Sequence, residues 1–313
     1  MGKIAFVFPG QGSQSVGMGQ DLYNRSLNAK NIFDKADIVL GKSISKICFE
    51  GPDEDLKLTI NTQPAILTTS IAALEALKEK CDIVPDYLAG HSLGEYGALY
   101  ASGVIDFETA MKLIQKRAEL MNEAAVSTSG AMTAVIGMDK EKIEETISKA
   151  SGIVSVANYN SPAQIVITGE KSAVEEANKL LSEAGAKRVI PLPVSGGFHS
   201  ALMKDAGIKF GEFASSFDVK DALIPVITNV DALVTTKAND FKNKMPVQIY
   251  SSVYWTQTVQ KMIEDGVDTI VEIGPGKVLA GLCKKIDASL KIYNIFDADS
   301  LNKTVEELSI QCV

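Results

Sequence analysis

The stretch DYLAGHSLGEYGAL, residues 86–99, decides the fold class of this chain. A short apolar strand at 86–91 runs directly into a helix that begins at residue 93, with GHSLG at the turn between them. The pattern Gly-x-Ser-x-Gly at a strand-to-helix turn is typical of a nucleophile elbow. The N–H groups at the start of the helix favour negative charge developing beside the serine. We therefore predict that Ser92 is an acyl-forming nucleophile; the alternative is a purely structural turn.

Strands and helices alternate on both sides of this turn. That alternation implies a mostly parallel sheet covered by helices on both faces. The predicted strands are 3–8, 86–91, 224–230, 268–274 and 291–296, and the predicted helices are 62–80, 93–101, 106 to about 125 with Asp106 as N-cap, 246–264 and one after Gly276.

The middle of the chain follows a different order. After a break of small residues it reads strand, helix, two strands, helix, strand, which is the ferredoxin-like βαββαβ pattern and forms a complete small domain. We predict an α/β fold in which a hydrolase-like parallel-sheet domain, residues 1–126 and 196–313, carries an inserted ferredoxin-like subdomain, residues 127–195. The strands of this subdomain are predicted at 131–138, 152–160, 163–169 and 187–194, and its helices at 139–150 and 170–185.

Composition excludes several classes of function. The net charge of −8 and the lack of a basic stretch argue against a nucleic-acid partner. No apolar run approaches the roughly 20 residues that a membrane helix needs, and the apolar N-terminal run breaks at Pro9, so it is a strand and not a signal peptide. Cys48, Cys81, Cys283 and Cys312 are scattered, so we expect reduced thiols, no metal site and a cytoplasmic protein.

A serine nucleophile needs a general base, and the chain contains only two histidines. His91 adjoins Ser92, and successive side chains at such a turn point apart, so we expect His91 to pack or hydrogen-bond under the sheet. His199 lies in VSGGFHS, 194–200, where the chain returns from the insertion, and a domain junction is where a cleft residue should lie. We predict His199 as the base; the alternative is an exposed loop histidine. No acidic residue declares itself as a third member, and a backbone carbonyl could orient the imidazole instead.

The glycine-rich stretch FPGQGSQ, residues 8–14, directly follows the first predicted strand. A dinucleotide-binding fingerprint would need glycine at position 15, where Ser15 stands. We predict an oxyanion loop in which the backbone N–H of Gln11 acts together with that of Leu93; the alternative is a tight glycine turn. GPGK at 274–277 lacks the flanking residues of a phosphate loop and is predicted to be a structural turn.

Arg117 lies on the apolar stripe of the helix that starts after Asp106. Ile114 and Met121 share its face, whereas Lys116 lies on the solvated face. Leaving such a charge buried and unpaired costs about 3–5 kcal/mol, so it needs an anionic partner. Two partners remain open: an internal Asp or Glu, or a substrate carboxylate held through two parallel guanidinium bonds.

Motifs along nearly the whole chain carry a family resemblance. They are FPGQGSQ at 8–14, QPAIL at 63–67, GHSLGEY at 90–96, Arg117 followed by Met121, NYNSP at 158–162, FHS at 198–200 and EIGPGKVL at 272–279. In this order they resemble the malonyl-CoA:acyl carrier protein transacylases, acyltransferases that load malonyl units for fatty acid synthesis. The fold of that family, a hydrolase-like domain with a ferredoxin-like insertion, agrees with the organisation above. One departure is Gly196-Gly197, where the family often has other small residues or proline.

The resemblance implies a reaction and its machinery. Ser92 would be acylated by malonyl-CoA with His199 as base, and the ester would pass to the phosphopantetheine thiol of holo acyl carrier protein, with no cofactor. The amides of Gln11 and Leu93 would form the oxyanion hole, and Arg117 would bind the malonyl carboxylate.

The same resemblance implies supporting residues. Gln248 matches the position whose main-chain carbonyl orients the histidine, and Phe198 fits enzymes that handle malonyl rather than bulkier groups. Met121, Gln63 and Asn160 lie in the matching motifs and complete the predicted site.

Three other functions use the same features. A serine thioesterase or other hydrolase would give the ester to water, and a polyketide-pathway malonyltransferase would serve a different carrier protein. A non-catalytic carrier-protein docking module would keep the fold without the chemistry, although Ser92, His199 and Arg117 argue against it.

Overall fold

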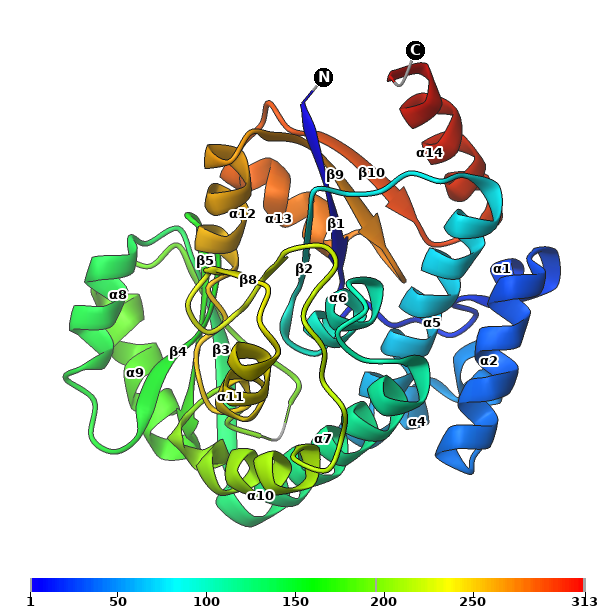
Figure 1. The fold of residues 1–313 in the computed structure, drawn as a ribbon. Helices are drawn as coiled ribbons and strands as arrows, with labels where there is room; N and C mark the ends of the chain where they lie inside the picture. The colour runs from blue at the N-terminus through cyan, green and yellow to red at the C-terminus, as the bar shows by residue number, and fades with distance from the viewer. Residues whose placement is uncertain (1, 195, 312–313) are drawn as a thin grey trace.

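The computed structural model of the protein describes residues 2–194 and 196–311. Within them the chain forms a six-stranded, mainly parallel sheet and a separate four-stranded antiparallel sheet (Figure 1). The predicted fold class is confirmed. Ser195, the predicted last residue of the subdomain, and Cys312 lie outside the described residues.

The large sheet has the strand order β10-β9-β1-β2-β7-β8. All neighbours in it pair in parallel except β7 and β8, which are antiparallel. Because β1 lies in the middle and is covered on both faces, its apolar run is buried from its second residue on. The strands are β1 (Lys3–Phe8), β2 (Tyr87–Gly90), β7 (Val226–Ile227), β8 (Val234–Thr235), β9 (Val267–Ile273) and β10 (Lys291–Ile295).

Two layers of helices cover this sheet. Phe6 and Phe8 point into a core shared with α5 (Thr59–Lys80) and α6 (Glu95–Ala101), whereas Ala5 and Val7 point into a core shared with α12 (Trp255–Glu264) and α13 (Val278–Ile286). The structure also has elements for which no prediction was made: α1 (Gln20–Arg25), α2 (Leu27–Leu40), α3 (Ile44–Glu50), α4 (Asp53–Lys57), α10 (Lys204–Ala214), the 3₁₀ turn η2 (Ala201–Met203) and α14 (Ala298–Gln311).

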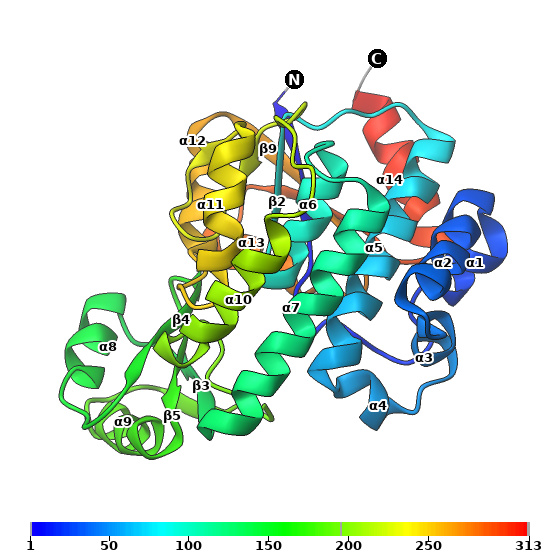
Figure 2. The same ribbon diagram turned by 60° about the horizontal axis from the view of Figure 1, so that its bottom comes forward.

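The long helix α7 (Phe107–Thr128) leads from the large domain to the inserted sheet (Figure 2). The Asp106 side chain accepts a hydrogen bond from Thr109 N at 2.8 Å, which confirms the predicted N-cap. The helix runs about one turn beyond its predicted end and stops at Ser129, whose φ of 44° turns the chain into the next strand.

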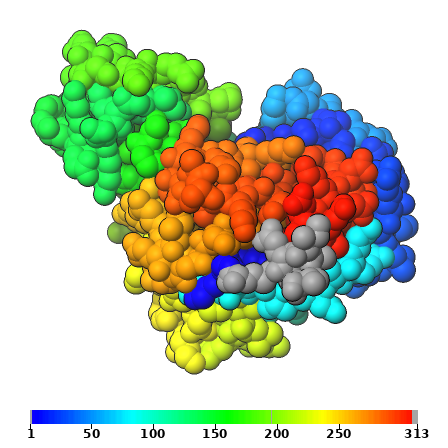
Figure 3. All heavy atoms as spheres, turned by 90° about the horizontal axis from the view of Figure 1, so that it is seen from above, coloured from blue at the N-terminus to red at the C-terminus, as the bar shows by residue number. Residues whose placement is uncertain are grey.

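The inserted sheet has the order β4-β5-β3-β6, which is the ferredoxin-like arrangement. One face of this sheet packs against the two helices of the subdomain, and the subdomain projects from the side of the large domain (Figure 3). The boundaries 127–195 stay a prediction. The elements are β3 (Gly130–Ile136), α8 (Lys140–Ile147), β4 (Val154–Ser161), β5 (Gln164–Glu170), α9 (Lys171–Glu183) and β6 (Arg188–Pro191).

The predicted helix over 246–264 is wrong in its middle. Helix α11 (Ala238–Gln248) ends near the start of this range, and α12 begins only at Trp255. Between them Val253 pairs in parallel with β4: its N–H donates to Ala157 O at 2.8 Å, and its carbonyl accepts from Tyr159 N at 3.0 Å. These bonds need extended backbone, so the helix cannot continue through this segment. The predicted strand 224–230 is likewise reduced to β7.

Candidate active site

Ser92 opens the 3₁₀ turn η1 (Ser92–Gly94), directly after β2. Its φ of 52° lies in the left-handed region, which costs a residue other than glycine about 1–3 kcal/mol. A Cβ on Gly90 would lie 2.0 Å from the Gly94 carbonyl carbon, and a Cβ on Gly94 would lie 2.1 Å from Phe8 O. Glycine is therefore required on both sides of the serine, and the tight turn presents Ser92 at the end of the sheet.

The His199 imidazole lies against Ser92. Its Nε2 is 2.8 Å from Ser92 Oγ, and its Nδ1 is 2.9 Å from Gln248 O and 3.0 Å from Ser251 O. Because carbonyl oxygens only accept, Nδ1 carries the proton and Nε2 is free to accept the Ser92 hydroxyl proton. Two backbone carbonyls thus orient the imidazole of His199, the predicted base, in the place where a carboxylate would stand in a triad.

Burial holds His199 in its neutral form. Desolvation, the charge of Arg117 and the nearby His91 together lower the pKa of His199 to about 3. The imidazole is therefore available as a proton acceptor at neutral pH. An anion bound at Arg117 would offset the second of these causes and strengthen the base.

Arg117 is 1% exposed and is held by neutral oxygens. One terminal nitrogen donates to Gln63 Oε1 at 2.6 Å, and the other donates to Gln248 Oε1 at 3.0 Å and Ser92 Oγ at 3.1 Å. Within the part of the chain that the structure describes, Arg117 forms no ion pair with an Asp or Glu, and its Nε has no acceptor. The internal salt bridge that the sequence left open is absent there, so an anionic ligand is the remaining partner for this charge.

These side chains line a pocket of about 120 Å³ between the large sheet and the inserted one. The small subdomain contributes Met132 and Asn158 to its wall. Of the predicted site residues, Gln248 and Asn160 stand behind the wall, and the others line it. The lining residues are Gln11, Gln63, His91, Ser92, Leu93, Arg117, Met121, Met132, Asn158, Leu192, Val194, Phe198 and His199.

The backbone amides of Gln11 and Leu93 adjoin this pocket. Neither donates to a protein acceptor among residues 2–194 and 196–311. Ser92 O accepts from Gln248 Nε2 at 2.9 Å, and in a planar trans peptide the next N–H points the opposite way. The Leu93 N–H is therefore directed away from Gln248 and remains available to a ligand.

The remaining predicted residues support others. Gln63 Nε2 donates to Met121 Sδ at 3.5 Å, so Gln63 bridges Met121 and Arg117. Asn160 Oδ1 is 2.8 Å from His91 Nε2, whose ring packs on Trp255 with 5.7 Å between the ring centroids. The expected packing and hydrogen bond of His91 are confirmed, and His91 also lines the wall of the pocket.

The sequence interpretation missed two residues of this site. Ser251 shares the His199 proton with Gln248, and Asn229 Oδ1 accepts a hydrogen bond from Ser92 N at 2.8 Å. Asn229 follows β7, the strand beside β2, and polar residues at neighbouring carboxyl ends of a parallel sheet are the signal that could have found it. Ser251 gave no signal, because it acts through its backbone.

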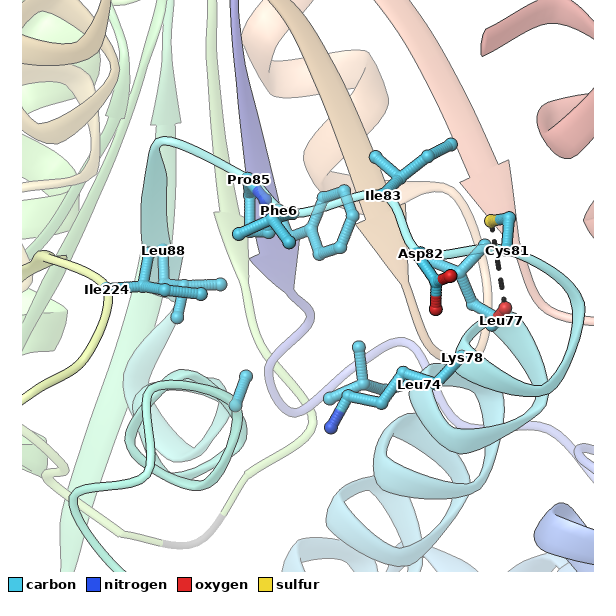
Figure 4. Close-up of a pocket in the computed structure, with 12 residues that line it drawn as sticks. Phe6, Leu74, Leu77, Lys78, Cys81, Asp82, Ile83, Pro85, Leu88 and Ile224 are labelled. Carbon is cyan, nitrogen blue, oxygen red and sulfur yellow. Dashed lines mark hydrogen bonds between the residues drawn. The ribbon is translucent and has the colours of Figure 1, made fainter. Parts of the chain in front are cut away.

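A second pocket of about 200 Å³ lies between β1, β2 and the end of α5 (Figure 4). Its wall is mainly apolar, with Phe6, Leu74 and Leu88 facing one another and the charged Lys78 and Asp82 at one side. It contains neither a serine nor a histidine, so the pocket at Ser92 is the candidate active site.

Among residues 2–194 and 196–311 there is neither a candidate metal-binding cluster nor a candidate membrane-spanning helix. No three His, Cys, Asp or Glu side chains in this part of the chain are grouped so that they could hold a metal ion. No helix described there is both long enough and apolar enough to cross a membrane.

Known proteins are similar to this chain in sequence and in fold. The acyl transferase domain family model matches residues 5–295. The malonyl CoA-acyl carrier protein transacylase of Bacillus subtilis (strain 168) is 49% identical over 98% of this chain and 98% of its own. A solved acyl carrier protein S-malonyltransferase from Vibrio cholerae is 44% identical, covers 96% of this chain and 99% of its own, and superposes with a TM-score of 0.94. A solved complex of a type II PKS acyl-carrier protein with its malonyl-transacylase matches at 42% identity over 97% of this chain and 99% of the matched chain, with a TM-score of 0.95.

Proposed function

Because the chain belongs to the malonyl CoA-acyl carrier protein transacylases, within the acyl transferase domain family, we propose that it moves malonyl groups from malonyl-CoA to acyl carrier protein for fatty acid synthesis. The observation that carries the proposal is Arg117, a buried cation that forms no ion pair with an Asp or Glu among the described residues, beside a hydrogen-bonded Ser92–His199 pair. A nucleophile next to such a cation suits an acyl group that bears a carboxylate.

The first half of the reaction loads Ser92. His199 Nε2 takes the hydroxyl proton as Ser92 Oγ attacks the thioester carbonyl of malonyl-CoA. The amides of Gln11 and Leu93 stabilise the oxyanion of the tetrahedral intermediate. Collapse of the intermediate breaks the C–S bond, and the thiolate of CoA leaves with the proton held by His199.

The second half unloads Ser92 by the same steps in reverse. The phosphopantetheine thiol of holo acyl carrier protein gives its proton to His199 and attacks the malonyl ester. Ser92 Oγ leaves and recovers the proton, so the enzyme returns to its starting state and the cycle is ping-pong.

Arg117 selects the acyl group. Its guanidinium holds the malonyl carboxylate through two parallel N–H bonds, and Gln63 and Gln248 fix its plane. Met121 and Phe198 supply apolar walls that suit a short acyl group. Asn160 does not line the pocket and acts indirectly, by holding His91 in the wall of the pocket.

Intact-mass measurement tests the proposal. After mixing with malonyl-CoA we expect a malonyl adduct that is absent from Ser92→Ala and that disappears when holo acyl carrier protein is added. Steady release of CoA without a trapped adduct would indicate a hydrolase instead. Carrier proteins of fatty acid and polyketide synthesis are compared as acceptors, because one solved relative is bound to a type II PKS carrier.

The cellular location is also a proposal. Cys48 and Cys283 are buried thiols without a disulfide, and burial raises the pKa of Cys48 to about 12, which keeps that thiol protonated. Together with the substrates proposed above, this supports a cytoplasmic enzyme whose partners are malonyl-CoA and holo acyl carrier protein.

A further inference from the structure

Asn229 lies directly behind the Ser92 turn without lining the pocket. It is fully buried, and its side chain bonds both arms of the turn. Oδ1 accepts from Ser92 N at 2.8 Å, and Nδ2 donates to Gly90 O at 2.7 Å. A single carboxamide therefore spans the peptide units on either side of His91.

We propose that Asn229 is a positioning residue, which holds the Ser92 turn in its left-handed conformation and so aims Ser92 Oγ and the Leu93 amide at the acyl group. The proposal rests on the malonyl-transfer function, because that reaction is its readout. Asn229 itself touches neither the substrate nor the reacting atoms in this scheme.

The backbone of Asn229 is fixed on both sides. Its N–H donates to Glu95 Oε2 at 2.6 Å, and its carbonyl accepts from Tyr254 N at 3.0 Å. Glu95 begins α6, immediately after the turn, and is itself buried. The chain therefore closes a loop in which Glu95 holds Asn229 and Asn229 holds the turn that leads to Glu95.

A second carboxamide fixes the next peptide of the turn. Gln248 Nε2 donates to Ser92 O at 2.9 Å and approaches Asn229 Oδ1 at 3.4 Å. The two side chains together engage Gly90 O, Ser92 N and Ser92 O. Loss of Asn229 would leave the first two of these buried groups without partners and would release Ser92 to relax toward negative φ, away from His199 and Arg117.

The position demands a group that both donates and accepts. Asparagine does so at every pH, whereas an ionised carboxylate only accepts and would face the Gly90 carbonyl with a second acceptor. A protonated carboxyl group has nearly the same shape and restores one donor and one acceptor. The substitution Asn229→Asp therefore converts positioning into a property that depends on pH.

The test measures kcat and KM for malonyl-CoA against pH in wild type and Asn229→Asp. At pH 8 we expect kcat of the variant to fall on the order of 100-fold, the size of effect produced by about 1 Å of misplacement, with KM little changed. As the pH falls, the new carboxyl group takes up a proton and the ratio of variant to wild-type kcat should rise. A merely structural role would not produce this recovery.

Other charged and ionisable groups surround the position in both proteins. They are Glu95 on α6, Arg117 on α7, Lys244 on α11 with its partner Asp231, and the two histidines of the site. Taking the ratio of the variant to wild type at each pH removes their shared contributions. Only the new carboxyl group is absent from the wild type.

A matched control separates positioning from folding. Asn294 on β10 donates to Glu272 Oε2 at 2.9 Å, remote in the sheet order from β2, and Asn294→Asp should lower stability without any recovery of kcat at low pH. If circular dichroism shows Asn229→Asp to be unfolded, single-turnover malonylation of Asn229→Ala replaces it, with the same loss expected.

The outcomes are distinct. A pH profile of Asn229→Asp parallel to wild type, or a kcat of Asn229→Ala within about threefold of wild type, would overturn the proposal. Wild-type enzyme that forms no malonyl adduct would instead overturn the proposed function.

Discussion

Arg117 keeps a positive charge where burial opposes one. Desolvation lowers its pKa, and the nearby Tyr96 and Glu95 act in the opposite direction. The guanidinium lies 5.8 Å from the Tyr96 ring centroid, a distance at which the ring quadrupole favours a cation. Its terminal nitrogens donate hydrogen bonds to Gln63 and Gln248, but these neutral partners leave the charge unbalanced. The residue is thus prepared for an anion.

Removing this cation should change which acyl group the enzyme accepts. Hydrogen bonds to charged groups contribute about 1.5–3 kcal/mol, so Arg117→Ala should lower kcat/KM for malonyl-CoA by roughly 10- to 150-fold. Acetyl-CoA has no distal carboxylate and should be affected much less. The measurement is the ratio of kcat/KM values for the two thioesters.

The neighbouring lysine offers a control for this change. Lys116 lies on the solvated side of α7, 3.5 Å from Glu119, and Lys116→Ala should leave the ratio unaltered. An Arg117→Ala enzyme that lost both activities equally would show that the arginine supports the site without selecting the carboxylate.

At the scale of elements, two glycines in helical segments have opposite surroundings: one is tightly packed against backbone, and the other faces open space. Gly94 follows Ser92 where the turn crosses β1, and an added Cβ would meet Phe8 O at 2.1 Å and Pro9 O at 2.7 Å. Gly281 lies inside α13, and an added Cβ there would meet nothing within 4 Å. The first glycine is required by close backbone approach, and the second only adds flexibility to a helix.

These surroundings predict opposite effects of the same substitution. Gly94→Ala should lower the free energy of unfolding by about 1–3 kcal/mol or more, because backbone must move to admit the methyl group, and should reduce malonylation. Gly281→Ala should raise the free energy of unfolding by about 0.5–1 kcal/mol and leave activity unchanged. Urea unfolding of both variants measures the difference. Equal shifts of the same sign would refute the geometric argument.

The elements also show what a sequence can predict. The turn at Ser92 could be predicted because its glycines, strand and helix are adjacent in the chain. His199 could be proposed as the base because the chain contains only two histidines. The break between α11 and α12 was not, since it depends on Val253 pairing with β4, far away in the sequence. Ser251 was not predicted because it acts through its backbone carbonyl, and Asn229 was not predicted because it meets Ser92 only in the folded chain.

The whole molecule joins its two sheets more closely than a simple insertion would. One face of the small sheet covers its own core, but Met132 and Val166 belong to the core that contains α7. The edge strand β4 continues by pairing to Val253, and two hydroxyl groups reinforce that edge: Ser252 Oγ donates to Val156 O at 2.6 Å and Thr256 Oγ1 to Tyr159 O at 2.9 Å. The pocket lies where the two parts meet, so its geometry depends on their being held together.

This shared core and edge predict that both sheets unfold together. Trp255, the only tryptophan, is buried in the large domain and reports its unfolding by fluorescence, while hydrogen exchange of β3 and β5 reports the small sheet. We expect coincident urea transitions for the two probes in wild type.

The double change Ser252→Ala and Thr256→Val removes both hydroxyl bonds. It should lower the free energy of unfolding of the small sheet by about 1–3 kcal/mol in total, so that this sheet unfolds at a lower urea concentration. Ser182→Ala, which loses only a bond to Asn178 O within α9, should shift neither probe relative to the other. Separate transitions in wild type would mean that the small sheet is an independent unit and that the pocket is closed by weak contacts alone.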